Sequence, residues 1–170
     1  MRQKIYIIAD THFSHENVIK FENRPFLNTE EMDRVMIDNW NNKVNENDLV
    51  FHLGDVIVGK TSDANRVLPR LNGRKILILG NHDRFTKTKW RRLGFEPYQR
   101  YLLQDYLLTH IPVDEGPLRV AVESGFLKGN IHGHTHKSNS HLDPNLYICC
   151  CVEWINYTPI LFDKLIEKTE

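Results

Sequence analysis

The sequence lacks any long hydrophobic run. Hydrophobic residues make up 41% of its 170 residues, but no apolar stretch approaches the roughly 20 residues that cross a bilayer. We therefore expect no membrane segment. The first ten residues lead directly into a strand-like run without the small-residue cleavage site of a secretory signal. These features predict a cytoplasmic protein.

Cysteine is scarce and net charge is absent. The three cysteines, Cys149, Cys150 and Cys151, are consecutive, and neighbouring residues on a strand point to opposite faces. Their odd number and the lack of a disulfide spacing agree with a reducing cytoplasm. Lys+Arg and Asp+Glu both number 22, so the sequence lacks the strongly basic character of nucleic-acid-binding proteins, although a local basic patch stays open.

The sequence also lacks repeats, low-complexity tracts and linkers, which predicts one domain over residues 1–170. In the first half, buried strands alternate with helices, as in βαβ units with a parallel sheet. The strands are predicted at 4–9, 48–53 and 75–79, and the helices after a cap at Asn28, at 62–71 and at 86–93. Shorter strands follow at 106–109, 129–132, 146–152 and 159–162, then a helix at 163–170.

Histidine, in contrast, is plentiful, with nine residues. Polar residues of the types that bind metals follow five of the predicted strands. They are Asp10, His12, Asp55, Asn81, His110, His134 and His136. Ligands of open α/β sheets bind at the carboxyl ends of the strands, so we expect these side chains to meet in one region.

The donor types indicate which cations would bind there. Imidazole nitrogen combined with carboxylate oxygen suits Mn, Fe, Co, Ni and Zn. Seven candidates are too many for one tetrahedral ion but suit two divalent ions that share a carboxylate, and we expect Mn. Only Asp10 and Asp55 are anionic, so a pair of cations would keep excess positive charge and attract an anionic ester. Paired cations are the usual arrangement for displacement at phosphorus.

Five short motifs occur in order: Asp10-x-His12, Gly54-Asp55, Gly80-Asn-His-Asp83, His110 and Gly133-His-Thr-His136. This set resembles the calcineurin-like metallophosphoesterase superfamily, and in particular its small branch without a cap domain. The resemblance implies an α/β fold, a four-layer α/β/β/α sandwich with two mixed β-sheets. It also implies one metal on Asp10, His12, Asp55 and His136, and a second on Asp55, Asn81, His110 and His134, with Asp55 as the bridge.

The same resemblance implies a phosphoesterase in which a hydroxide between the two metals attacks phosphorus. His82 would protonate the leaving oxygen, and Asp83 would orient the His82 imidazole through a hydrogen bond. The open site favours a phosphodiester, from a small phosphate ester or a nucleotide, while neutral net charge disfavours nucleic acid. Two alternatives stay open: a phosphomonoesterase, and a non-catalytic scaffold that binds proteins and keeps its metals for structure.

Three further residues are candidates for substrate binding. Arg24 could bind a phosphate bidentately, or it could be a solvated loop arginine. His15 and Asn17 follow the first motif closely and could line the pocket, with a plain loop histidine as the alternative for His15. His52 and His132 precede ligands on predicted strands and are expected to be satisfied groups in the core.

Overall fold

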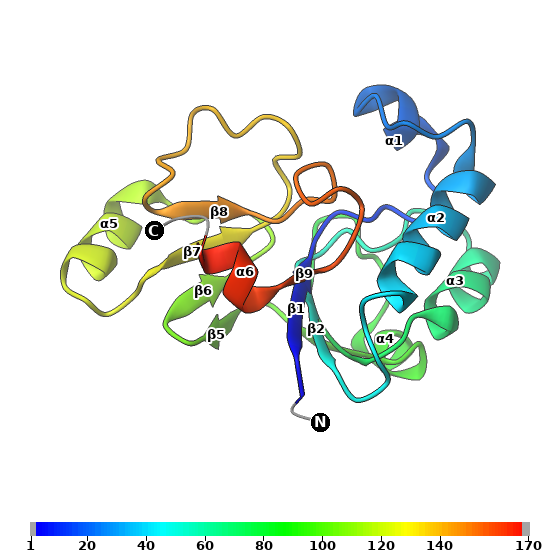
Figure 1. Cartoon of the computed structure of the whole chain (residues 1–170), viewed down its shortest axis with the longest axis horizontal. Coiled ribbons are helices and arrows are strands. Elements are labelled where there is room, and N and C mark those ends of the chain that lie inside the picture. The colour runs from blue at the N-terminus through cyan, green and yellow to red at the C-terminus, as the bar shows by residue number, and fades with distance from the viewer. Residues whose placement is uncertain (1–2, 168–170) are drawn as a thin grey trace.

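The computed structural model describes residues 3–167 and contains two mixed β-sheets (Figure 1). The first has the order β4-β3-β2-β1-β9, and the second has the order β5-β6-β7-β8. Strands β1 to β4 run parallel and β9 is antiparallel to β1, whereas β5 is antiparallel to β6 and the pairs β6–β7 and β7–β8 are parallel. The bounds are β1 Ile5–Ile8, β2 Leu49–His52, β3 Arg74–Ile78, β4 Phe95–Tyr98, β5 Tyr101–Leu103, β6 Tyr106–Leu108, β7 Gly129–His132, β8 Tyr147–Cys149 and β9 Ile160–Leu161.

The two sheets pack face to face because both faces of the first sheet are apolar. Alternate residues of a strand point to opposite faces. Ile7, Phe51 and Ile78 lie in a buried cluster with Leu108 and Ile131 of the second sheet. Their neighbours along the strands, Tyr6, Val50 and Leu77, belong to a second cluster on the opposite face. The continuous apolar runs of the sequence therefore reflect strands covered on both sides.

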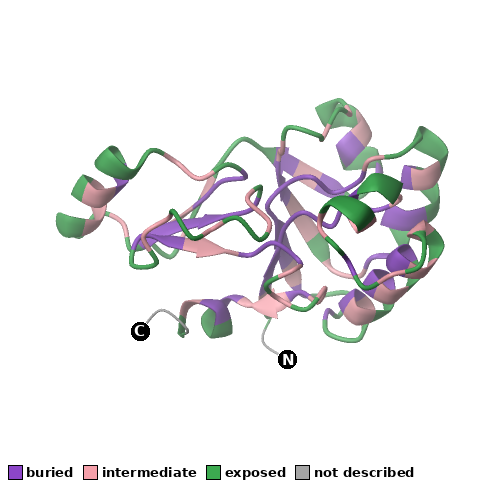
Figure 2. Ribbon diagram, turned by 90° about the horizontal axis from the view of Figure 1, so that it is seen from above, coloured by how far each residue is buried: buried purple, intermediate pink, exposed green. Residues whose placement is uncertain are grey.

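Helices form the two outer layers. On the first sheet lie α2 (Thr29–Asn41), α3 (Thr61–Val67) and α4 (Lys87–Arg92), which bury Met32, Trp40 and Trp90 against it. On the second sheet, α5 (Glu115–Glu123) packs Leu118 against Leu146 and Tyr147. Figure 2 shows buried residues along the central strands and exposed residues on the outer sides of these helices. The predicted α/β/β/α sandwich is confirmed.

Helix boundaries differ from prediction where proline and glycine intervene. The helix expected at 62–71 ends at Val67 and continues as a 3-10 turn, η1 (Leu68–Arg70), because Pro69 has no N–H to donate. Two helices were not predicted: α1 (Glu16–Phe21), which is short, and α5, whose first turn contains Gly116 and Pro117. The last helix, α6, spans Phe162–Ile166, and residues 168–170 of the prediction lie outside the described residues.

None of the helices between residues 3 and 167 is long and apolar enough to cross a membrane.

The two sheets touch directly at the carboxyl end of β1. The Ala9 N–H donates to the carbonyl of Cys150 at 3.0 Å, and the Val152 N–H donates to the carbonyl of Ala9 at 3.1 Å. Ala9 and Cys151 thereby form a parallel bridge between the chain segments that extend β1 and β8. Because Asp10 follows immediately, the loops of both sheets gather around it.

Candidate metal centre

Five loops at strand ends carry the predicted ligands to this junction. Asp10 and His12 follow β1, Asp55 follows β2, Asn81 follows β3, His110 follows β6, and His134 and His136 follow β7. Five of these seven residues have a left-handed backbone: φ is 57° at Asp10, 48° at His12, 55° at Asp55, 69° at His134 and 45° at His136. Such conformations cost energy in residues other than glycine and cluster at functional sites.

The predicted first subsite would comprise Asp10, His12, Asp55 and His136. Asp10 Oδ1 lies 3.8 Å from His12 Nε2 and 3.8 Å from His136 Nε2. Two donors that are each about 2.1 Å from one ion lie about 3–4 Å apart, so these atoms have the spacing of ligands that share a cation. Asp10, His12 and His136 form one of the side-chain groups that could hold a metal.

The predicted second subsite would comprise Asp55, Asn81, His110 and His134. Asp55 Oδ2 lies 3.4 Å from His110 Nε2 and 3.6 Å from His12 Nε2, so this single oxygen faces a histidine of each subsite. Asn81 Oδ1 lies 2.9 Å from His110 Nε2. The His134 ring centre is 5.1 Å from that of His110, and its imidazole belongs to none of the metal-binding groups among the described side chains. Its role as a ligand stays a prediction.

Unsatisfied polar atoms show that this donor set suits a cation. Asp10 Oδ1 and both ring nitrogens of His12 are buried and have no hydrogen-bond partner among the described residues. A buried polar atom without a partner is energetically costly. A divalent cation between Asp10 Oδ1 and His12 Nε2 would compensate both atoms at once.

Two histidines are held so that Nε2 faces the centre. His110 Nδ1 donates to the carbonyl of Leu53 at 2.7 Å, and His136 Nδ1 donates to Glu153 Oε2 at 3.1 Å, since a carbonyl and a carboxylate can only accept. A hydrogen bond from one ring nitrogen commonly fixes the other as the metal ligand.

Burial and charge shift the protonation of these groups in opposite directions. Burial raises the pKa of Asp10 to about 6, against the lowering effect of His110 and His136. Burial also tends to raise the pKa of Asp55, but the hydrogen bond and charge of His110 hold it well below its usual value. Burial lowers the pKa of His110, yet Asp55 and Asp10 outweigh it and raise the value to about 9. Burial lowers the pKa of His12.

Glycine at positions 80 and 133 leaves room for the two ligand carboxylates. A Cβ at Gly80 would collide with Asp55 Oδ1, and a Cβ at Gly133 would collide with Asp10 Oδ2. The close approach of backbone to carboxylate therefore requires glycine here.

Asp83 does not play the predicted part. Its Oδ2 accepts from the backbone N–H groups of Asp55 and Gly80 at 2.9 and 2.8 Å, and its Oδ1 accepts from that of Val56 at 3.0 Å. No hydrogen bond joins it to the His82 ring among the described residues, so the expected orientation of His82 by Asp83 is wrong. Asp83 instead ties the loop after β2 to the loop after β3.

His82 itself lies at the exposed side of the centre. Its side chain is 42% exposed, and its Nε2 is 4.0 Å from Asp55 Oδ2. Its backbone N–H donates to Asp55 Oδ1 at 2.9 Å. A group in this position could reach a bound ester from solvent, and its role as proton donor stays a prediction.

Arg24 is neither solvated nor free to bind a phosphate. Its side chain is 0% exposed. Its Nη2 donates to Glu153 Oε1 and to the carbonyl of Asp10, both at 2.7 Å, and its Nη1 donates to the carbonyl of Thr11 at 2.8 Å. The predicted contact with substrate is therefore wrong, because buried partners occupy the donors.

His15 lies beside the first subsite. It occupies the N-cap position of α1 without a side-chain capping hydrogen bond, and its ring centre is 5.4 Å from that of His12. Asn17 is exposed on the first turn of the same helix. Contact of either residue with substrate stays a prediction. His52 and His132 are buried as expected: His52 Nε2 is 3.0 Å from Thr11 Oγ1, and His132 Nδ1 donates to the Gly133 carbonyl at 2.8 Å. His52 is only partly satisfied, because its Nδ1 has no hydrogen-bond partner among the described residues.

Two residues that contact the ligands escaped the sequence analysis. Glu153 contacts His136 and Arg24 as described, and Cys151 Sγ lies 3.3 Å from Asp10 Oδ2. Neither belongs to a recognisable motif. Only the bridge between the segments that extend β1 and β8 brings them to the site.

Comparison with other proteins gives relatives along the whole chain. An uncharacterized protein of Methanocaldococcus jannaschii is 41% identical over 178 residues, covering 98% of this chain and 93% of its own. The crystal structure of a protein of unknown function from Aquifex aeolicus has a TM-score of 0.71 at 26% identity, covering 99% of this chain and 100% of that one. The nuclease MPE of Pseudomonas putida shares the fold, with a TM-score of 0.54 at 18% identity over 78% of this chain and 61% of its own.

A family model described as calcineurin-like phosphoesterase matches residues 3–138. This range contains all seven predicted ligands together with His82. The donor set around Asp10 and Asp55, the two mixed sheets and this match agree: the chain belongs to the calcineurin-like phosphoesterase family, whose members hydrolyse phosphate esters with the help of metal ions.

Proposed function

We propose that the protein hydrolyses a phosphodiester, on a small phosphate ester or a nucleotide, with a pair of divalent cations of which Mn²⁺ is the favoured ion. The observation that carries this proposal is the position of Asp55 Oδ2, 3.6 Å from His12 Nε2 and 3.4 Å from His110 Nε2. A carboxylate oxygen between histidines of two subsites suits a bridging ligand. Asp10 and Asp55 supply two negative charges against the four positive charges of two such ions.

The roles of the chain's own groups follow from this arrangement. When bound, the cations would supply an activated water at neutral pH and stabilise charge on the phosphoryl oxygens. His82 extends from the loop after β3 into the exposed side of the centre, where it would donate a proton to the leaving oxygen. The hydrogen bond from its backbone N–H to Asp55 Oδ1 keeps this residue next to the bridging carboxylate.

The position of Arg24 supports a diester over a monoester. A monoester dianion carries one more negative charge than a diester, and Arg24 was the cation that the sequence offered to compensate it. Its guanidinium is buried and paired with Glu153 at 2.7 Å. That charge is therefore neutralised inside the protein and is not presented to a ligand.

Two chromogenic substrates test the preference. Chelator-treated protein supplied with Mn²⁺ should hydrolyse bis-nitrophenyl phosphate with a higher kcat/KM than nitrophenyl phosphate. Faster hydrolysis of the monoester would favour the phosphomonoesterase. No hydrolysis of either compound with Mn, Fe, Co, Ni or Zn would favour the scaffold.

Replacing His82 tests its role as acid. His82→Ala should lower kcat by about 100-fold or more, the usual contribution of a general acid, while the protein keeps its bound Mn²⁺. The loss should be larger for an alkyl than for a nitrophenyl leaving group, because nitrophenolate needs little protonation. His141→Ala, at an exposed loop histidine, is the control. Equal losses for both leaving groups, or none, would count against the assignment.

A further inference from the structure

A buried acid–base pair lies next to the first subsite and contacts His136 and the carbonyl of Asp10. Glu153 and Arg24 form it, with Nε and Nη2 of the arginine donating to Glu153 Oε1 at 2.9 and 2.7 Å. The side chain of Glu153 is 1% exposed and that of Arg24 is 0% exposed. Their charges cancel, so the pair adds no net charge to the metal centre.

Both partners reach the ligands directly. Glu153 Oε2, the oxygen that Arg24 leaves free, accepts from His136 Nδ1 at 3.1 Å. Arg24 donates to the carbonyls of Asp10 and Thr11 at 2.7 and 2.8 Å. These carbonyls belong to the loop that carries the ligands Asp10 and His12, both of which have positive φ. The pair therefore contacts His136 and Asp10 directly, and it contacts the loop of His12 through Thr11.

We propose that the pair of Glu153 and Arg24 is a positioning device for the first subsite: Glu153 fixes the tautomer of His136, and Arg24 fixes both Glu153 and the loop of Asp10. The inference rests on the proposed metal centre. The proton of His136 is held on Nδ1, so Nε2, which lies 3.8 Å from Asp10 Oδ1, keeps its lone pair for a cation.

The donor and acceptor roles in these hydrogen bonds predict the effect of replacing Glu153. Arg24 can only donate, so it requires an acceptor at the Oε1 position. In Glu153→Gln, the amide oxygen would take that place and the amide NH₂ would face His136 Nδ1. That nitrogen would then have to accept, and the proton would move to Nε2, the atom that faces Asp10. An isosteric change would therefore block the ligand atom.

Nitrogen NMR of the imidazole tests this without any metal. At a pH at which the His136 imidazole is neutral, its proton should lie on Nδ1 in the unsubstituted protein and on Nε2 in Glu153→Gln. Titration with Mn²⁺ should then show the first subsite weakened by about 10- to 100-fold, the usual effect of losing such a partner. Arg24→Lys should weaken it as well, because one ammonium cannot replace the planar fork of donors.

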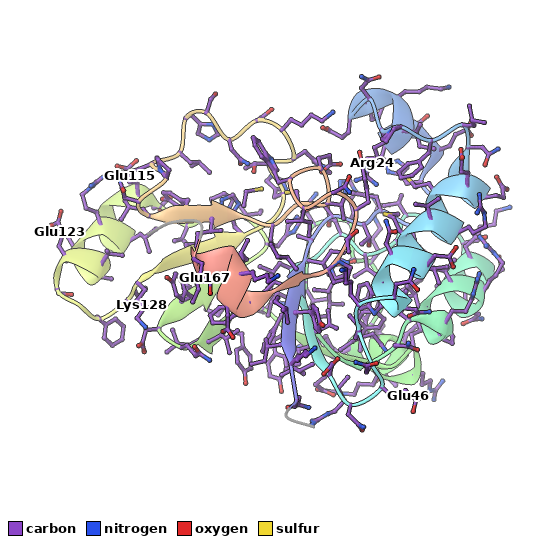
Figure 3. All side chains as sticks on the ribbon, in the orientation of Figure 1. Arg24, Glu46, Glu115, Glu123, Lys128 and Glu167 are labelled. Atoms are coloured by element: carbon purple, nitrogen blue, oxygen red, sulfur yellow. The ribbon has the colours of Figure 1, made fainter. Side chains whose placement is uncertain are left out.

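Glu115→Gln is a matched control. Glu115 pairs with Arg119 at 2.7 Å but is exposed on α5, well apart from Arg24 (Figure 3). It should leave the His136 tautomer and Mn²⁺ binding unchanged. The inference would be overturned if Glu153→Gln kept the proton on Nδ1 of His136 and bound Mn²⁺ as tightly as the unsubstituted protein. It would also be overturned if the unsubstituted protein lacked the Nδ1 proton, and this second test does not require Glu153→Gln to fold. A parent with the expected tautomer that bound no cation pair would refute the proposed function instead.

Discussion

The two carboxylates Asp55 and Asp83, which lie close together near the centre, have different roles. One oxygen of Asp55 faces histidines of both subsites. Asp83 belongs to the same motif as Asn81, but both of its oxygens accept hydrogen bonds from backbone N–H groups. Burial raises the pKa of Asp83, and the three donors oppose that shift. We therefore expect a substitution of Asp83 to lower the free energy of unfolding more than it lowers kcat.

Asp83→Asn should therefore lower the free energy of unfolding by about 2–4 kcal/mol, because hydrogen bonds to a charged group each contribute about 1.5–3 kcal/mol. An amide has a single acceptor oxygen and cannot satisfy donors on both sides. Urea unfolding of metal-free protein measures the change. Asp105→Asn, at an exposed carboxylate that is 62% accessible, should change stability by less than about 0.5 kcal/mol. Unchanged stability in Asp83→Asn together with an altered pH profile of kcat would restore the idea that Asp83 serves His82.

At the scale of elements, the site depends on strand ends that approach each other closely. The loop after β7 passes close to Asp10 and Ala9. A Cβ added at Gly133 would lie only 2.8 Å from Ala9 Cβ and would collide with Asp10 Oδ2. The parallel bridge from Ala9 to Cys151 holds the two sheets in this register. A strand end with a larger side chain would push the two sheets apart at the ligands.

Gly133→Ala is expected to destabilise the protein by about 1–3 kcal/mol, as overpacking usually does, and to lower the Mn²⁺ retained after dialysis. Thermal unfolding and metal analysis of one sample give both values. Gly116→Ala is the control, because nothing apart from neighbouring residues of α5 lies within 4 Å of a Cβ at this position. Alanine should change stability there by less than about 0.5 kcal/mol, because its smaller entropy loss in a helix is opposed by the contact of its Cβ with the following Pro117. Full metal retention in Gly133→Ala would show that the sheets can move apart without harm.

On the scale of the whole molecule, metal binding is linked to protons. The pKa of His110 is raised to about 9 and that of Asp10 to about 6 in the metal-free protein, so below these values each holds a proton that a cation must displace. Metal affinity should therefore rise as the pH rises from about 6 to 9.

Calorimetry of Mn²⁺ binding in buffers with different ionisation enthalpies tests this linkage. Proton release should be larger near pH 7.5, where Asp10 is ionised and His110 still carries its extra proton, than above pH 9, by about one proton per protein. The proton lost by an activated water is released at both pH values and does not contribute to this difference. Release that did not change between pH 7 and 9.5 would mean that His110 is already neutral in the metal-free protein.

The sequence by itself determined the types of the ligands and the strand ends that carry them. Continuous apolar runs predicted buried strands, and each run ended in a motif, so β1, β2 and β3 of the first sheet and the positions of Asp10, Asp55 and Asn81 could be predicted from local patterns, whereas β4 was not predicted. Only the tertiary structure decided the parts played by Arg24, Asp83 and Glu153. Their partners lie far along the chain, 129 residues apart for Arg24 and Glu153, and only the packing of the two sheets brings such partners together. A local motif fixes what a side chain is and where its strand ends, whereas long-range packing fixes what that side chain touches.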